Sequence, residues 1–171
     1  MFYPKLKNLK KERIPDYSID KLDWWLGTRR QNTRKFVNPL QFSLDCNIDI
    51  NHALKLFSYC TFGQEVKLLR KKYVTLCPIC EHRIATNYQE PVKKGIRCNN
   101  CETDIPNEYF VDHISIFFEL LESPRDYIPD IELESESIIK KAPSLRVSEV
   151  MGNTDEDIRR LCPPKKFFDM L

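Results

Sequence analysis

Apolar residues recur at helical spacing in two segments of the N-terminal third of the chain. In the second segment, positions 50, 53, 54 and 57 are apolar and share one helical face. Asp49 or Asn51 caps this predicted helix, and Gly63 ends it. The first segment has the same period and lies between Ser18, its expected cap, and Gly27, its expected end. We therefore predict two helices here.

Alternating apolar and polar positions predict short strands elsewhere. Residues 36–46 alternate at Leu40, Phe42 and Leu44, which is typical of a strand. Three more short strands are expected in the middle of the chain, over residues 72–76, 83–86 and 95–97. Residues 109–121 fit both periods, and we predict a strand that turns into a helix.

The last 49 residues, 123–171, change in character. Five prolines interrupt them, and glutamates alternate with serine and leucine at positions 132–137. This composition is not that of a compact domain and predicts an extended arm that carries apolar anchor points for a partner. The expected anchors are Ile138, Ile139, Val147, Val150, Met151, Phe167, Phe168, Met170 and Leu171.

These patterns predict an α+β fold in four segments. Residues 1–35 form a basic N-terminal helix or arm, and residues 36–71 a small winged-helix-like unit. Residues 72–122 hold a cysteine-containing ribbon with the strand and helix that follow it. Residues 123–171 are the acidic, proline-punctuated docking arm.

Composition narrows the function classes. The chain has 171 residues, of which 42% are hydrophobic and 30% charged, enough apolar material for a packed core. No apolar run approaches the roughly 20 residues that span a bilayer, and the basic N-terminus is not followed by the apolar region of a secretory signal. We therefore expect a cytoplasmic protein without a membrane partner. Its four glycines form no phosphate-binding loop, so we expect neither a nucleotide-binding enzyme nor a small-molecule substrate.

Four of the seven cysteines have the spacing of a zinc site. They follow a C-x2-C-x17-C-x2-C pattern, in which each two-residue spacer lets a pair of thiolates converge on one ion. Four thiolates leave no position for an activated water, so we expect one structural Zn²⁺ and no catalytic residue. The expected ligands are Cys77, Cys80, Cys98 and Cys101.

Charge is distributed unevenly along the chain. Residues 1–35 carry ten basic and four acidic side chains, whereas residues 106–171 carry eight and fourteen. One interpretation is that the basic N-terminal part binds nucleic acid and the acidic C-terminal part binds protein. The other is that the two parts pack against each other. The candidate basic contacts are Arg29, Arg30, Arg34, Lys35, Lys71, Lys72, Lys93 and Lys94.

The pair Trp24–Trp25 stands beside the first of these arginines. Aromatic and basic residues together can stack on bases and hold phosphates. Tryptophan and arginine are also enriched at protein–protein contacts, and one tryptophan can simply fill the core while the other shields it. We favour core or protein contact over nucleic acid for this pair.

The run from Ala53 to Phe57, continuing through Leu69 to the Cys77-Pro-Ile-Cys80 motif, resembles winged-helix/zinc-ribbon accessory subunits of bacterial conflict systems. Middle components of ATPase-containing three-component systems and of Lamassu-type assemblies are examples. The resemblance covers about a third of the chain. It implies a non-catalytic bridge between a large ATPase-like subunit and an effector, in an antiviral defence complex.

We therefore expect an accessory or adaptor subunit that binds larger protein subunits of a hetero-complex. The alternative is a zinc-ribbon module that binds DNA or RNA, for transcription or DNA sensing. An enzyme is a distant third, because only His52, His82 and His113 with scattered carboxylates would support it.

Overall fold

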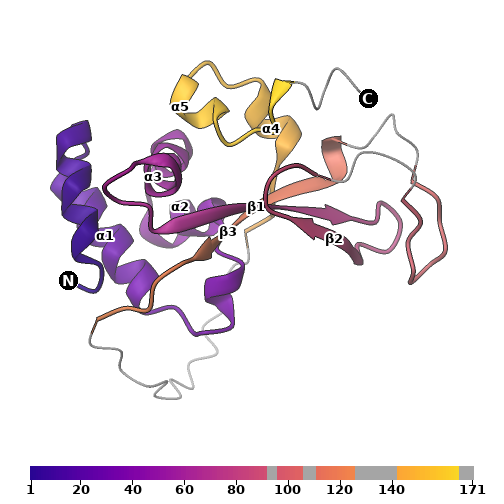
Figure 1. Cartoon of the computed structure of the whole chain (residues 1–171), viewed down its shortest axis with the longest axis horizontal. Coiled ribbons are helices and arrows are strands. Elements are labelled where there is room, and N and C mark those ends of the chain that lie inside the picture. Colours follow the sequence, from indigo (N-terminus) through magenta and orange to yellow (C-terminus); the bar gives the residue numbers. More distant parts are fainter. Residues whose placement is uncertain (92–95, 106–110, 126–141, 166–171) are drawn as a thin grey trace. The chain divides into compact units, whose positions relative to one another are not determined.

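The computed structural model describes residues 1–91, 96–105, 111–125 and 142–165. The chain divides into two units: residues 1–70 with 118–143, and residues 71–117 with 144–171. These boundaries differ from those of the four predicted segments, because each boundary falls inside a strand or between residues 143 and 144. Helices and a small sheet are both present (Figure 1), so the α+β class is confirmed at that level.

The first unit begins with the 3₁₀ helix η1 (Pro4–Glu12) and the α-helix α1 (Asp16–Gly27). The buried carboxylate of Asp23 fixes the start of the chain on α1, since it accepts the backbone N–H groups of Phe2 at 2.9 Å and Tyr3 at 2.7 Å. Gly27 ends this helix as predicted. A side chain at Gly27 would collide with the Phe2 ring, so glycine is required there by close packing.

Ser18 is not the cap of α1, contrary to prediction. The helix begins at Asp16, three residues earlier than a cap at Ser18 would place it, and Pro15 occupies the cap position with an extended backbone. Ser18 is instead fully buried within the helix, and its hydroxyl oxygen lies 2.9 Å from Nε2 of His52. Ser18 therefore contacts a neighbouring helix, although the sequence pattern alone assigns it to the end of its own helix.

The predicted strand over residues 36–46 is wrong. After a single 3₁₀ turn, η2 (Thr33–Lys35), the chain forms the helix α2 (Pro39–Cys46). Asn38 caps α2 by accepting the backbone N–H of Leu40 at 3.0 Å, and Pro39 occupies the first turn. The Asn38-Pro39 sequence is a specific signal for the start of a helix. Three alternating apolar residues are a weaker signal, because so short a run is compatible with a helix as well as with a strand.

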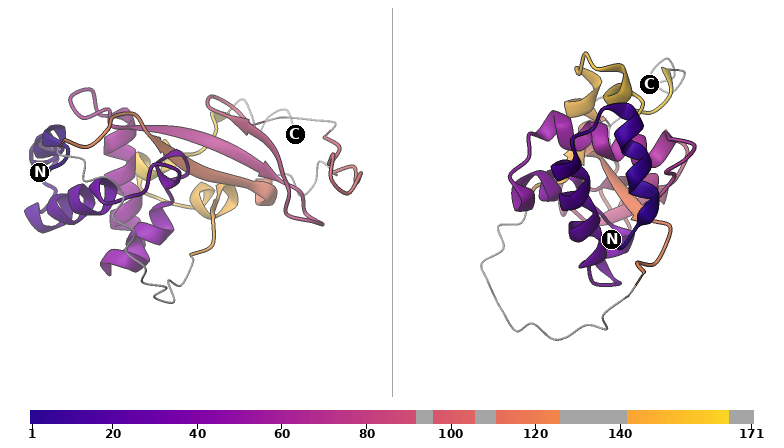
Figure 2. Two further views of the ribbon diagram at one scale, coloured as in Figure 1. Left: turned by 90° about the horizontal axis from the view of Figure 1, so that it is seen from below. Right: turned by 90° about the vertical axis from the view of Figure 1, so that its left-hand side faces the viewer.

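The predicted helix after Asp49 is confirmed as α3 (Ile50–Phe62), and Gly63 ends it. Asp49 is the cap, because its carboxylate accepts the backbone N–H of His52 at 3.0 Å. The views of Figure 2 show α1, α2 and α3 gathered together in the first unit. The core between them is aromatic, with ring centroids 5.0 to 6.4 Å apart. Its members are Trp25, Phe42, Phe57 and Phe118.

Four strands form one sheet in the order β2-β1-β3-β4. Strands β1 (Leu69–Leu76) and β2 (Arg83–Asn87) form an antiparallel hairpin, which confirms two of the predicted strands. Strand β3 (Ile114–Leu120) confirms the strand part of the prediction for residues 109–121, but no helix follows it in the described residues 121–125. Residues 109 and 110 lie outside the described residues.

Part of the expected C-terminal arm is folded. Strand β4 (Leu145–Arg146) pairs antiparallel with β3, and the short helices α4 (Val147–Met151) and α5 (Glu156–Arg159) follow. Val147 and Val150, predicted to anchor in a partner, are fully buried in this chain. The other predicted anchors, except the exposed Met151, lie outside the described residues.

Candidate metal centre

The four predicted cysteines lie together in the second unit. The first pair occupies the turn between β1 and β2, and the second pair lies in residues 96–105. All four sulfur atoms are within 4.8 Å of one another. Across the two pairs, the sulfurs of Cys77 and Cys101 are 3.5 Å apart and those of Cys80 and Cys98 are 3.6 Å apart. These four thiols can therefore hold one metal ion.

Each pair of cysteines sits in the same kind of hydrogen-bonded turn, or knuckle. The backbone N–H of Cys77 donates to the carbonyl of His82 at 2.9 Å, five residues on. In the second knuckle the backbone N–H of Cys98 donates to the carbonyl of Thr103, also at 2.9 Å. Two equivalent turns thus present two equivalent pairs of sulfurs to a common centre.

The residue after each pair has the same left-handed backbone. Glu81 has φ 54° and Glu102 has φ 58°, and each donates its backbone N–H to the carbonyl of the first cysteine of its pair, at 3.0 and 2.8 Å. Glycine is the usual residue in this region, because other L-residues adopt it at a cost of about 1–2 kcal/mol. The chain accepts this cost twice to close the two turns.

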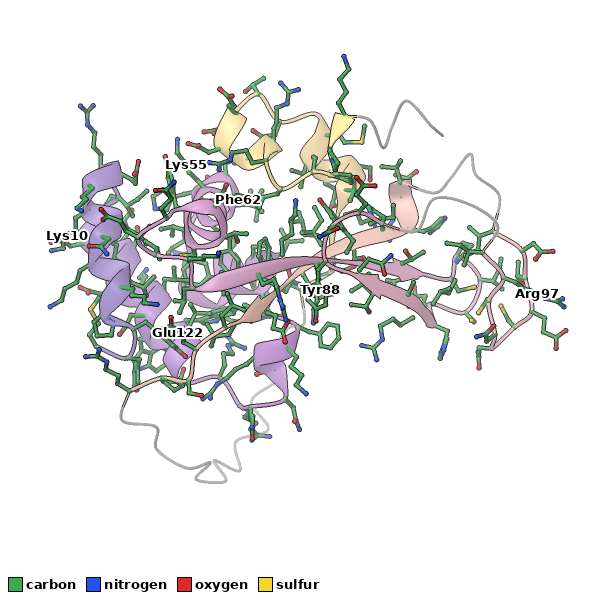
Figure 3. All side chains as sticks on the ribbon, viewed as in Figure 1. Lys10, Lys55, Phe62, Tyr88, Arg97 and Glu122 are labelled. Carbon is green, nitrogen blue, oxygen red and sulfur yellow. The ribbon has the colours of Figure 1, made fainter. Side chains whose placement is uncertain are left out.

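A backbone bridge closes the second knuckle. Arg97 and Asp104 pair as an antiparallel bridge, and the N–H of Ile105 donates to the carbonyl of Ile96 at 3.0 Å. The exposed guanidinium of Arg97 lies 3.0 Å from the Glu102 carboxylate. Figure 3 labels Arg97, with the sulfur atoms gathered nearby. Residue 95, in the third predicted ribbon strand, is outside the described residues.

The four thiols differ in their exposure and in their partners. The first cysteine of each pair is buried and the second is half-buried. The Asn100 side-chain amide donates to the Cys80 sulfur at 3.4 Å and, with the backbone N–H of His82, lowers the pKa of that thiol. The Thr103 hydroxyl, 3.3 Å from the Cys101 sulfur, and its backbone N–H lower the pKa of Cys101 to about 6.

The buried thiol of Cys77 has the opposite tendency. Burial raises the pKa of Cys77 to about 11, even though its sulfur accepts the backbone N–H of Ile79 at 3.4 Å. Sequence reasoning found the cysteines but missed Asn100 and Thr103. The available signal was the polar Asn99-Asn100 spacer, in place of the Pro78-Ile79 spacer of the first pair.

The remaining cysteines, Cys46, Cys60 and Cys162, are not members of this group of four. Burial raises the pKa of Cys60 to about 12, which suits a small apolar core residue. Burial also raises the pKa of Cys46 and of Cys162. Within the described part of the chain, no histidine belongs to a group of side chains close enough to share a metal.

The two tryptophans have opposite environments. Trp25 is 3% exposed, and its indole N–H donates to Asp45 at 2.8 Å. The Arg29 guanidinium stacks 3.8 Å from the centre of the Trp25 ring and pairs with the same carboxylate at 2.5 Å. Trp24, the preceding residue of α1, is 62% exposed. Trp25 therefore fills the core, as expected for one tryptophan of the pair in the third interpretation above.

The predicted basic contacts are divided between the surface and the interior. Arg30 and Lys35 are exposed, whereas Arg34 is half-buried and donates to the carbonyl of Arg29 at 2.9 Å. Lys72 is only 3% exposed, and the Lys71 ammonium donates to the carbonyls of Arg160 and Cys162 at 3.2 and 3.3 Å. The remaining contact candidates, Lys93, Lys94, Phe167 and Phe168, lie outside the described residues.

Comparison of the chain with protein-family models, with curated proteins and with solved structures finds no match. The resemblance to conflict-system subunits gains no support from it. In the part of the chain that the structure describes, no helix has the length and apolar character needed to cross a bilayer.

Proposed function

We propose that this protein is a non-catalytic adaptor in which a structural Zn²⁺ holds a ribbon together and an exposed aromatic helix face binds a larger protein subunit. The donor set supports zinc, since four soft thiolates suit a tetrahedral Zn²⁺ and leave no position for a substrate or a reactive water. Such a site stabilises a fold and catalyses nothing.

The first unit supports the winged-helix part of the proposal. Its order is α1, a bridging residue, α2, α3 and then two strand ends, as in a winged helix. Val37 is the bridging residue, and its N–H and carbonyl both bond to Phe118 in β3, at 2.7 and 2.9 Å. Three residues join α2 to α3, as in a helix-turn-helix. In chain order the ribbon follows β1 and precedes β3, where a winged helix has its wing.

The exposed face of α1 is the observation that carries the adaptor role. Trp24 is 62% exposed and Tyr17 is 59% exposed, and they lie seven residues apart on one side of the helix. Lys21 lies between them with its ammonium 5.9 Å from the centre of the Tyr17 ring. Large aromatic side chains of this kind are the usual hot spots of protein interfaces.

Nucleic acid is less well supported, because much of the basic charge is engaged within the chain. In η1, Lys5 pairs with Glu122, Lys10 with Asp16 at 2.9 Å and Lys11 with Glu65 at 2.5 Å. Helix α3, the recognition helix in this topology, contains one lysine and no arginine. A phosphate-binding surface needs several uncompensated cations.

Affinity capture of the full chain from its native host, after nuclease treatment, tests the proposal. We expect a stoichiometric protein subunit in the native mass spectrum, retained by Leu44→Ala and lost with Trp24→Ala. Leu44 is a suitable control because it is an apolar residue of α2 that is also about half exposed. Recovery of the bare chain, with nucleic acid lost on digestion and with affinity falling steeply in salt, would favour the nucleic-acid alternative.

A further inference from the structure

The two knuckles have the same backbone but different side chains around the metal centre. At the third position of the pair, the first knuckle has the exposed Ile79 and the second has Asn100. Two residues after the pair, the first has His82 and the second has Thr103. Asn100 and Thr103, whose side chains are hydrogen-bonded to sulfur atoms of the cluster, both belong to the second knuckle. The Asn100 amide donates to sulfur, whereas the Thr103 hydroxyl oxygen accepts the S–H of Cys101.

These two side chains contact the half-buried sulfurs. A metal-bound Cys101 thiolate has no proton to donate, so it would accept the hydrogen bond from the Thr103 hydroxyl. Asn100 reaches across to the other knuckle and donates to Cys80 at 3.4 Å, while the Thr103 hydroxyl lies 3.3 Å from Cys101 in its own knuckle. The buried sulfurs of Cys77 and Cys98 receive neither of these side chains. The side of the site that solvent reaches is thus the side that carries the extra hydrogen bonds.

We infer that Asn100 and Thr103 are positioning residues that hold the solvent-facing thiolates of Cys80 and Cys101 and thereby slow loss of the metal through that side. This inference rests on the proposed zinc site. A hydrogen bond to a metal-bound thiolate withdraws electron density from the sulfur and fixes its direction, so both its reactivity and its mobility fall. Removing a bond to a charged group changes a rate or an affinity by roughly tenfold.

The test measures alkylation of each cysteine in the zinc-loaded full chain. The thiolate sulfur adds to the C=C bond of N-ethylmaleimide, the adjacent carbon takes a proton from water, and released Zn²⁺ is read with a chromogenic chelator. Asn100→Ala is expected to speed alkylation of Cys80 about tenfold, and Thr103→Val to speed that of Cys101 about tenfold. Peptide mass spectrometry assigns each adduct to its cysteine.

Matched controls exist for both variants. Asn99→Ala removes the neighbouring exposed amide and should leave all rates unchanged, and Thr103→Ser keeps the hydroxyl and should behave as the wild type. A merely structural role would instead expose all four cysteines together in each variant. Equal rates for Asn100→Ala and Asn99→Ala, or uniform labelling of the four cysteines, would overturn the inference.

Zinc content separates this inference from the proposed function. If the wild type holds one zinc per chain and the variants fail to differ, only the role of Asn100 and Thr103 is refuted. If the wild type, purified and reconstituted with Zn²⁺, binds none, the metal centre itself is refuted along with it.

Discussion

Lys71 offers the sharpest test of the energetics of the second unit. Its ammonium is withdrawn from solvent, donates to the carbonyls of Arg160 and Cys162, and lies 4.9 Å from the centre of the Tyr73 ring. The Tyr73 hydroxyl donates to the carbonyl of Leu161 at 3.0 Å. Two side chains of β1 thus fasten three consecutive carbonyls that follow α5.

Burial lowers the pKa of Lys71 from 10.5 to about 8, because desolvation disfavours its charged form. The sign of the effect on folding follows directly. Below about pH 8 the folded protein must hold a charge that the unfolded chain hydrates freely, and this penalty is relieved as the pH rises from about 8 toward 10.5. The folded state should therefore gain stability with rising pH at this residue.

The test compares the free energy of unfolding of the wild type with that of Lys71→Met at each pH. We expect the difference, wild type minus variant, to increase by about 1.4 kcal/mol between about pH 7 and about pH 9. Urea denaturation followed by far-ultraviolet circular dichroism, with equal excess zinc in both proteins, measures the difference. Titration of groups that do not interact with Lys71 cancels in this comparison, including Cys60, whose pKa burial raises to about 12. Cys162, whose charge interacts with that of Lys71, is replaced by serine in both proteins.

Lys7→Met, at an exposed position on η1, controls for the loss of one positive charge. A difference between wild type and Lys71→Met that stays flat over this pH range, or that falls, would refute the reasoning. It would mean that the two carbonyls and the Tyr73 ring solvate the ammonium as well as water does.

Three further predictions concern the metal centre and the core. Cys98→Ser should lose zinc by elemental analysis and amide protection over residues 96–105, whereas Cys46→Ser should keep both. Glu81→Gly should stabilise the zinc-loaded protein by about 1 kcal/mol, seen as a higher Tm, because glycine relieves its left-handed φ of 54°; a lower Tm would contradict this. Trp25→Ala should cost about 3–5 kcal/mol in urea denaturation and Trp24→Ala less than about 0.5 kcal/mol; similar costs would contradict the assigned burial.

Local signals predicted the parts of the fold that local interactions determine. The cap Asp49 and the terminator Gly63 define α3, since both act within one turn of the helix they bound. The C-x2-C spacing predicted the metal centre for the same reason: each knuckle is a short turn closed by its own hydrogen bonds. Only the meeting of the two knuckles is a long-range event.

Signals that depend on distant contacts misled the sequence analysis. Ser18 has the chemistry of a cap, but its hydroxyl is satisfied by His52, a residue of another helix. Val147 and Val150 look unpartnered in an acidic, proline-rich context, yet they are buried in the chain itself. The composition of a segment indicates how much apolar surface it can bury by itself. It does not indicate whether strands elsewhere in the chain provide a surface against which the segment can pack.

The basic run that ends in β1 shows why a charged stretch of sequence need not be a charged surface. The Arg70 guanidinium pairs with Glu119 at 2.7 Å, Lys71 donates to backbone carbonyls, and Lys72 is almost entirely buried. Three adjacent cations therefore contribute little free charge for a polyanion, because each contact already made must be given up to bind a phosphate. Trp24 makes the opposite case, since its large apolar area is exposed and burying it gains free energy without breaking a pairing. Surface chemistry on these grounds favours a protein partner.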